Sequence, residues 1–117
     1  MTYSLPAFRK TIFVFFLFIT VKATAQPSIS SFTPLSGPLG TSVSITGTNF
    51  NAVPANNIVY FGAVKATVTS GSTTNLIVTV PAGTTYQVIS VLDYVTGLTG
   101  YSSRPFITTF TNPYGTG

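Results

Sequence analysis

The sequence predicts an all-β protein of the sandwich type, with about seven antiparallel strands in two packed sheets, preceded by a signal peptide. Short runs rich in β-branched residues recur at intervals of roughly 8–12 residues, which is the strand spacing of sandwiches and barrels. Gly and Pro interrupt the chain often, and no stretch after the N-terminus sustains the helical period of about 3.6 residues. The N-terminus itself has the three-part pattern of a secretory signal.

Residues 1–25 are predicted to be this signal peptide. The positive pair Arg9-Lys10 precedes an apolar run at 12–21, and the Ala-Thr-Ala at 23–25 supplies the small residues of a cleavage site. The apolar run is about half of the roughly 20 residues that a membrane-spanning helix needs. Cleavage predicts a secreted or cell-envelope protein without a membrane span, and a retained N-terminal anchor is the alternative.

Removal of the signal changes the charge of the chain. The whole sequence has a formal net charge of +4, but three of its five cations lie in the signal. The remainder keeps Lys65 and Arg104 against Asp93, a net charge of +1. This balance argues against nucleic acid as a partner, because nucleic-acid-binding surfaces are strongly basic. The length that remains suits one domain, and without cysteine its core is held by packing alone.

The first three predicted strands precede Gly62. Residues 28–33 carry Ile and Phe and stop at a proline, and residues 42–50 follow a turn rich in Gly and Pro. In residues 57–61 the apolar residues alternate, which places Tyr60 on the face opposite to its Val and Phe neighbours.

The last four predicted strands follow Gly62. Residues 64–69 alternate apolar and polar side chains, and residues 75–80 present Leu and two Val residues to one face. Residues 86–95 have apolar side chains at both parities, so their register stays open. A hairpin is predicted at the glycines of 97–100, and residues 105–110 are predicted to form the final strand.

The order of these features resembles the IPT/TIG domain, an immunoglobulin-like fold of the early-set type. On this resemblance residues 26–110 form one IPT/TIG domain. The composition of residues 111–117, TNPYGTG, predicts a linker, with a frayed or truncated tail as the alternative. The segments that carry the resemblance are PSISSFTP at 27–34, SGPLGT at 36–41, ITGTNF at 45–50, VYFG at 59–62, LIVTVPAG at 76–83 and YSSRPF at 101–106.

The resemblance implies a role in spacing or binding. Domains of this family occur in cell-surface receptors, in transcription factors, beside starch-acting enzymes and in exported bacterial surface proteins. They serve there as spacers or as modules that contact protein or carbohydrate. The family has no shared catalytic residues, so the resemblance assigns none to this chain.

The reactive side chains lead to the same expectation of no enzyme, no cofactor and no metal site. After the signal the chain has no His, Cys, Glu or Trp. Asp93 is the single carboxylate, so the carboxylate pair of glycoside hydrolysis is missing, and we predict Asp93 to be a strand-end or hairpin residue. Lys65 is the one base for a hydroxyl nucleophile, and the alternation around it predicts a solvated lysine.

Tyrosine is the side chain best suited to binding that remains, because its ring and hydroxyl serve wet interfaces. Tyr60 and Tyr101 are predicted to be placed for contact with a protein or carbohydrate at the cell surface. The predicted function is a non-catalytic exported module, a cell-surface spacer or a binding and adhesion domain within a larger protein. The alternative is an accessory, carbohydrate-contacting domain of a polysaccharide-degrading enzyme whose catalytic part lies outside this chain.

Overall fold

The computed structural model describes residues 25–110. The predicted signal peptide, apart from its last residue, and the predicted tail at 111–117 lie outside the described residues. No helix in residues 25–110 has the length and apolarity needed to cross a membrane. The elements are β1 (Ser28–Thr33), β2 (Ser36–Gly37), β3 (Ser42–Thr48), the short 3-10 helix η1 (Pro54–Asn56), β4 (Asn57–Phe61), β5 (Val64–Gly71), β6 (Asn75–Thr79), β7 (Val88–Asp93), β8 (Thr99–Pro105) and β9 (Ile107–Thr108).

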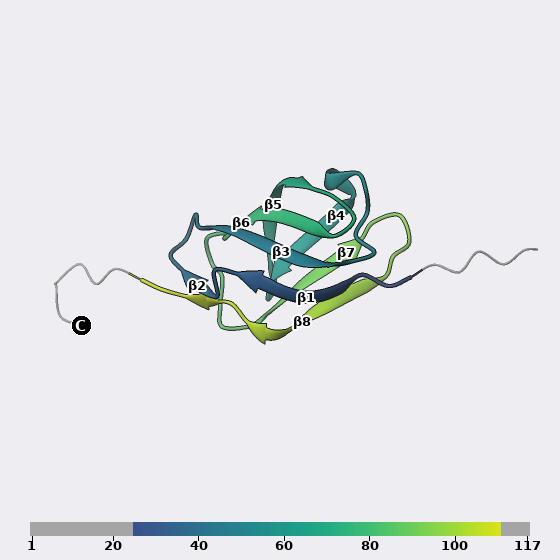
Figure 1. The fold of residues 1–117 in the computed structure, drawn as a ribbon. Coiled ribbons are helices and arrows are strands. Elements are labelled where there is room, and N and C mark those ends of the chain that lie inside the picture. Colours follow the sequence, from purple (N-terminus) through teal and green to yellow (C-terminus); the bar gives the residue numbers. More distant parts are fainter. Residues whose placement is uncertain (1–24, 111–117) are drawn as a thin grey trace, which may run out of the picture.

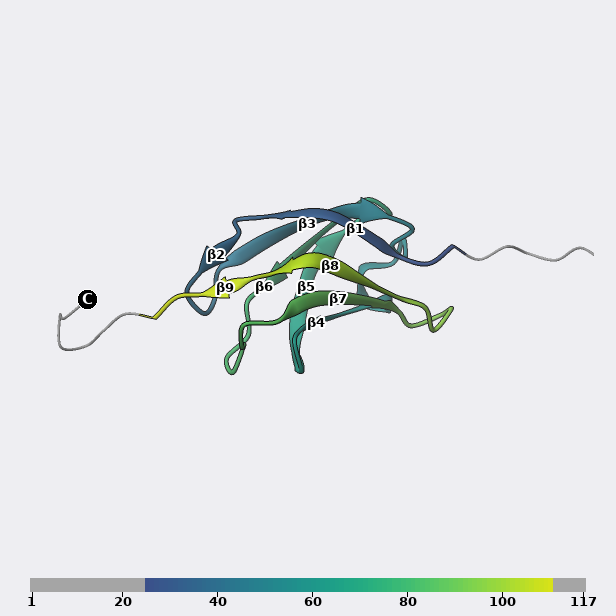
Figure 2. The ribbon, with the colours of Figure 1, turned by 90° about the horizontal axis from the view of Figure 1, so that it is seen from below.

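The strands form two layers that share one strand. The hydrogen-bonded order is β1-β3-β6-β5-β4-β7-β8, all antiparallel, and a short parallel pair joins β2 to β9. Strand β5 pairs with β4 through residues 64–66 and with β6 through residues 67–71, with a register shift between Val68 and Ser70. Figure 2 shows β1 and β3 in one layer and β4 and β7 in the other. The predicted β-sandwich is confirmed.

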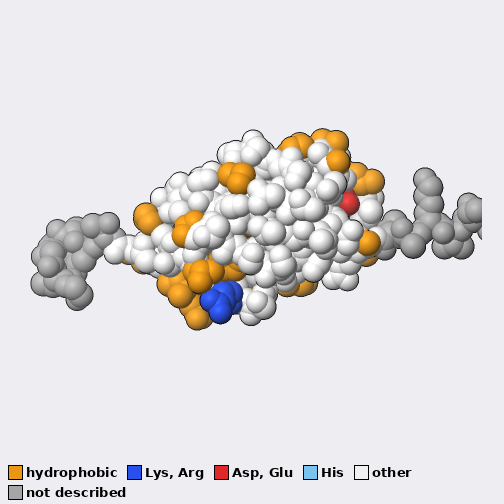
Figure 3. Space-filling model, in the orientation of Figure 1, with side chains coloured by type: hydrophobic (Ala, Val, Ile, Leu, Met, Phe, Trp, Pro, Cys, Tyr) orange, Lys and Arg blue, Asp and Glu red, His pale blue; other side chains and the backbone are white. Residues whose placement is uncertain are grey.

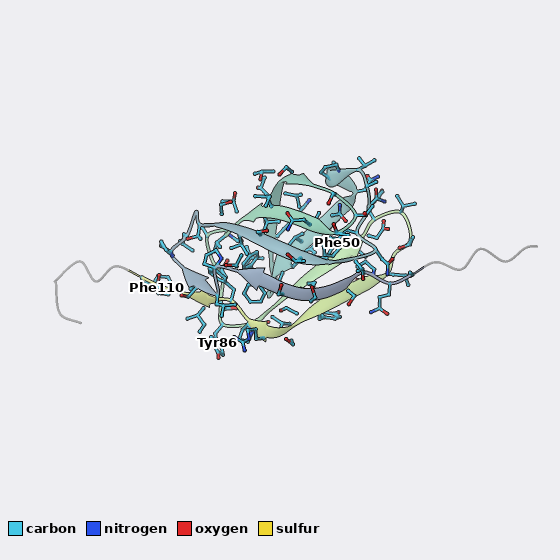
Figure 4. The ribbon with its side chains drawn as sticks, viewed as in Figure 1. Phe50, Tyr86 and Phe110 are labelled. Carbon is cyan, nitrogen blue, oxygen red and sulfur yellow. The ribbon has the colours of Figure 1, made fainter. Side chains whose placement is uncertain are left out.

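The core lies between the layers because each strand turns its apolar parity inward. In β4, residues 57, 59 and 61 are buried and the two between them are half-buried. The ring of Phe106 packs edge-to-face against Phe61 at 5.4 Å and also lies 6.4 Å from Phe32. Figure 4 shows Phe50 within the sandwich and Tyr86 and Phe110 at its periphery, in keeping with exposures of 3%, 70% and 75%.

The register of β7, which the sequence left open, is set by its position between β4 and β8. Ile89, Val91 and Asp93 turn inward, while Val88 is exposed and Leu92 is half-buried on the outer face. Apolar residues occur at both parities because the outer face of this strand is itself partly covered.

The prediction for the C-terminal part of the domain was wrong in its boundaries. The long final strand, β8, spans residues 99–105, and the chain that follows pairs only through the two residues of β9. Gly97, with φ of +75°, lies in the turn, but Gly100 lies within β8. A Cβ on Gly100 would collide with the backbone carbonyl of Pro27. This glycine therefore allows β8 to approach the start of β1. The sequence alone had predicted it to be part of a hairpin turn.

Candidate functional site

The two outer faces of the sandwich differ in chemistry. On the first layer, the outward positions of β3 are Ser42, Ser44, Thr46 and Thr48, a continuous row of hydroxyls. This composition keeps a nearly uncharged surface hydrated.

The outer face of the other layer carries aromatic and aliphatic side chains. Tyr60 of β4 lies opposite Ser90 of β7, and Ser90 lies opposite Tyr101 of β8. Lys65 of β5 faces Tyr60 on its other side. We call these four residues the tyrosine row. Because neighbouring strands are about 4.8 Å apart, the backbones of the two tyrosines are separated by about 10 Å.

The two tyrosines predicted from the sequence are thus brought together on one face, but with different exposure. Tyr101 is 64% exposed and presents most of its ring to solvent, whereas Tyr60 is half-buried. The next row on this face, Ile58 beside Leu92, is also half-buried. The tyrosine row is therefore a shallow aromatic surface on a rigid sheet.

A hollow of about 330 Å³ adjoins the Lys65 end of this row. It lies where β5 leaves β4 to pair with β6, and its lining includes Ala55 of η1, Ile58 and Thr67. The tyrosine row thus runs from an exposed ring on β8 to a depression beside a cation.

The loop that carries η1 is held by a buried polar cluster. The Asn57 side chain accepts a hydrogen bond from the Asn51 backbone N–H at 2.8 Å and donates to the carbonyls of Asn51 at 2.9 Å and Val53 at 3.3 Å. Asp93 Oδ1 accepts from Asn51 Nδ2 at 3.0 Å and from the Val95 N–H at 2.9 Å. Asp93 ends β7, which confirms the strand-end prediction.

Sequence reasoning did not single out Asn57. The sequence pattern could have indicated it, because Asn57 shares the inward parity of Val59 and Phe61 in the predicted strand. A buried asparagine at such a position must find hydrogen-bond partners, and here they come from the loop just before it.

The described side chains offer rings, hydroxyls, amides and two separated cations. No group of three or more potential metal ligands of the His, Cys, Asp or Glu type occurs within residues 25–110. Asp93 is occupied with the loop cluster, and Lys65 is exposed on the tyrosine row. This arrangement can hold a ligand by ring stacking and hydrogen bonds.

Solved structures with the same fold belong to much longer chains. A putative phosphatase from Bacteroides thetaiotaomicron is 26% identical, with a TM-score of 0.67 over 73% of this chain and 18% of that one. An auxiliary nutrient binding protein from the same organism is 24% identical, with a TM-score of 0.68 over 73% of this chain and 21% of that one. A Gamma-CGTase from alkalophilic Bacillus clarkii is 25% identical, with a TM-score of 0.61 over 75% and 13%.

The chain spans about a fifth or less of the length of these structures, and the likeness concerns the sandwich fold. A comparison with curated proteins found no match. A family model described as the IPT/TIG domain matches residues 27–111, which is most of the chain. The chain therefore belongs to the IPT/TIG family.

Proposed function

We propose that the protein is a non-catalytic, exported IPT/TIG module that acts at the cell surface as a binding or adhesion domain and spacer within a longer protein. The observation that carries this proposal is the difference between its two outer faces. One face is a row of hydroxyls, and the other holds Tyr60 and Tyr101 in one cross-strand row.

The tyrosine row suits a protein or carbohydrate ligand for physical reasons. A tyrosine ring offers a large contact area with few rotatable bonds, so little conformational entropy is lost on binding. Its hydroxyl donates and accepts hydrogen bonds at the wet edge of the interface. Because the row stands on four paired strands, its spacing is preorganised. Two of the similar structures are described as auxiliary nutrient binding proteins, which supports a binding role.

An accessory domain of a polysaccharide-degrading enzyme is the second candidate. The observation that favours it is the sandwich of the same fold within the Gamma-CGTase chain. The coding sequence that follows Gly117 distinguishes the two candidates. A catalytic domain there supports the accessory role, and further sandwich domains support the surface spacer.

A screen of the secreted protein against glycans and envelope proteins tests the tyrosine row. We expect Tyr101→Ala to weaken ligand binding about tenfold, a loss of about 1.4 kcal/mol in binding free energy. Tyr60→Ala is expected to weaken it similarly. Tyr94→Ala is the matched control, because Tyr94 is 72% exposed but lies in the turn after β7, outside the paired residues of the row.

Equal losses in Tyr101→Ala and Tyr94→Ala would contradict a binding role for the row. Absence of any binding at millimolar ligand would leave the spacer role alone. Turnover of a glycan or ester by this chain would refute the non-catalytic assignment.

A further inference from the structure

The two edge strands of the seven-stranded sheet, β1 and β8, lie side by side in both ribbon views (Figures 1 and 2). Within residues 25–110 they are not paired with each other through backbone hydrogen bonds. They touch at one end, where Gly100 packs against the carbonyl of Pro27. At the other end the segments that follow the two strands are joined by a hydrogen bond, in which Ile107 N donates to the Leu35 carbonyl at 3.0 Å. These two contacts close the ends of the gap between β1 and β8.

Between these two closures the edge strands separate and leave a pocket of about 290 Å³. This volume is near the lower end of the range of about 300–1,000 Å³ for ligand pockets, so it suits one small ring or one side chain. The apolar part of its lining comes from Ile29, Phe32 and Leu35. Phe32 is 4% exposed and belongs to the core, so this part of the lining is rigid.

A bulge in β8 shapes the polar side of the pocket. Val88 pairs with Pro105 and Ser90 pairs with Tyr101, so β8 places extra residues opposite β7. The hydroxyl of Ser102 holds this bulge, because it accepts from Ile89 N at 2.9 Å and donates to the Arg104 carbonyl at 2.7 Å.

The bulge places Ser103 and Arg104 in the lining, across from Ser30 and Ser31 of β1. Ser30 donates to the Thr46 carbonyl at 3.0 Å. Ser31, Ser103 and Arg104 are exposed, and the fork of a guanidinium matches the geometry of a carboxylate. One rim thus combines a cation with hydroxyls above an apolar surface.

The distribution of charge favours an anionic occupant. Figure 3 shows one cationic side chain near the C-terminal end of β8, beside hydrophobic side chains, and the acidic side chain at the other end of the molecule. Asp93, the single carboxylate, is held by Asn51 and by the Val95 N–H. It therefore does not neutralise the cation at the pocket.

We propose that this edge pocket binds one hexuronate unit of an acidic polysaccharide. The carboxylate pairs with Arg104, and the sugar hydroxyls bond to Ser31 and Ser103. The apolar side of the sugar ring lies against Ile29 and Leu35, with the buried Phe32 beneath them. The closures at both ends limit the free edge between β1 and β8 to the length of the pocket, which favours one inserted ring over a peptide strand paired along the edge. The inference rests on the proposed binding function and specifies a ligand class at a second place on the same module.

Calorimetric titration of the full chain with tri-galacturonate, and with the matched neutral galactose trisaccharide, tests the proposal. We expect the acidic trisaccharide to bind at least tenfold more tightly than the neutral one. This difference in affinity should shrink in 0.5 M salt, because salt screens the attraction between the exposed Arg104 and the carboxylate. Arg104→Gln should reduce acidic binding at least tenfold. The control is Arg104→Gln combined with Thr48→Lys, which restores the net charge from an exposed position on the hydroxyl face and should leave acidic binding as weak as in Arg104→Gln alone.

A second, independent readout is the amide spectrum of the protein. Titration with tri-galacturonate should shift the Ser31 and Ser103 amide resonances, and Ser103→Ala should weaken binding even if Arg104→Gln lowers stability. Equal binding of the neutral sugar, acidic binding restored in the Arg104→Gln, Thr48→Lys protein, equal binding of a tri-glutamate peptide, or no binding of the acidic sugar overturns the pocket. Losses confined to Tyr60→Ala and Tyr101→Ala would refute the pocket and leave the proposed function standing.

Discussion

Gly47 is the position of β3 at which one added carbon would disturb the sandwich directly. It occupies an inward position of the strand, opposite Ile29 of β1. A Cβ there would collide with the Ser28 carbonyl and would stand 2.7 Å from Cζ of Phe50. The glycine in the Thr-Gly-Thr-Asn-Phe segment therefore permits close contact between β1 and β3, and Phe50 fills the space beside it.

Gly47→Ala should destabilise the fold by about 1–3 kcal/mol, because the backbone of β1 must move to accept the methyl group. The free energy of unfolding in urea measures this change. Thr48→Ala on the exposed side of the same strand is the control, and it should change stability by less than about 0.5 kcal/mol. A Gly47→Ala protein as stable as the control would show that β1 can give way without cost.

At the scale of elements, the loop between β3 and β4 that carries η1 is held in place by side-chain hydrogen bonds more than by its short helix. Its three helical residues include none that is buried, and the residue before it makes no side-chain cap. The loop is anchored by the Asn57 amide below it and, through Asn51, by Asp93 at the end of β7. Because Ala55 lines the hollow beside Lys65, this anchoring also shapes one end of the tyrosine row.

Asn57→Ala should destabilise the fold by about 1–3 kcal/mol, because the half-buried backbone groups of Asn51 lose their partners. Asn56→Ala is the matched control, since the Asn56 contacts in the loop run through its backbone N–H and carbonyl. Thermal unfolding of both variants measures the difference. Similar melting temperatures would mean that water replaces the amide without loss.

At the scale of the whole molecule, the sandwich is one sheet bent over itself with two free edges. Strand β5 crosses from one layer to the other, while β1 and β8 meet without backbone pairing. An interior strand has hydrogen-bonded neighbours on both sides, and an edge strand has them on one side only. The stability of backbone amides should follow this difference.

Hydrogen exchange should therefore divide the strands in two groups. We expect the amides of β3, β4, β6 and β7 to exchange slowest, and the outward amides of β1 and β8 to exchange faster, because only one of their sides is paired. Native-state exchange followed by two-dimensional spectra measures this. Protection of the β1 and β8 edges equal to that of the interior strands would mean that the two edges are hydrogen-bonded and that the pocket between them is closed.

The sequence was most informative where alternation and breakers agreed. The predicted strand at 57–61, which alternates and ends at a glycine, matches β4 residue for residue. The strand predicted at 28–33 matches β1 as well, and there the flanking prolines alone set its bounds. At the C-terminal side the same reasoning was misled by Gly100, because a glycine that admits a neighbouring backbone looks in sequence like one that makes a turn.

The sequence by itself determined the all-β class, most strand positions and the likeness to the IPT/TIG domain, because these depend on local alternation, on turn residues and on their order. It also named Tyr60 and Tyr101 as candidates. Only the tertiary structure decided that these two stand in one row across Ser90, and that β1 and β8 enclose a pocket with Arg104 at its rim. Which side chains become neighbours across a sheet depends on strand order and register, and both are set by packing between segments far apart in the chain.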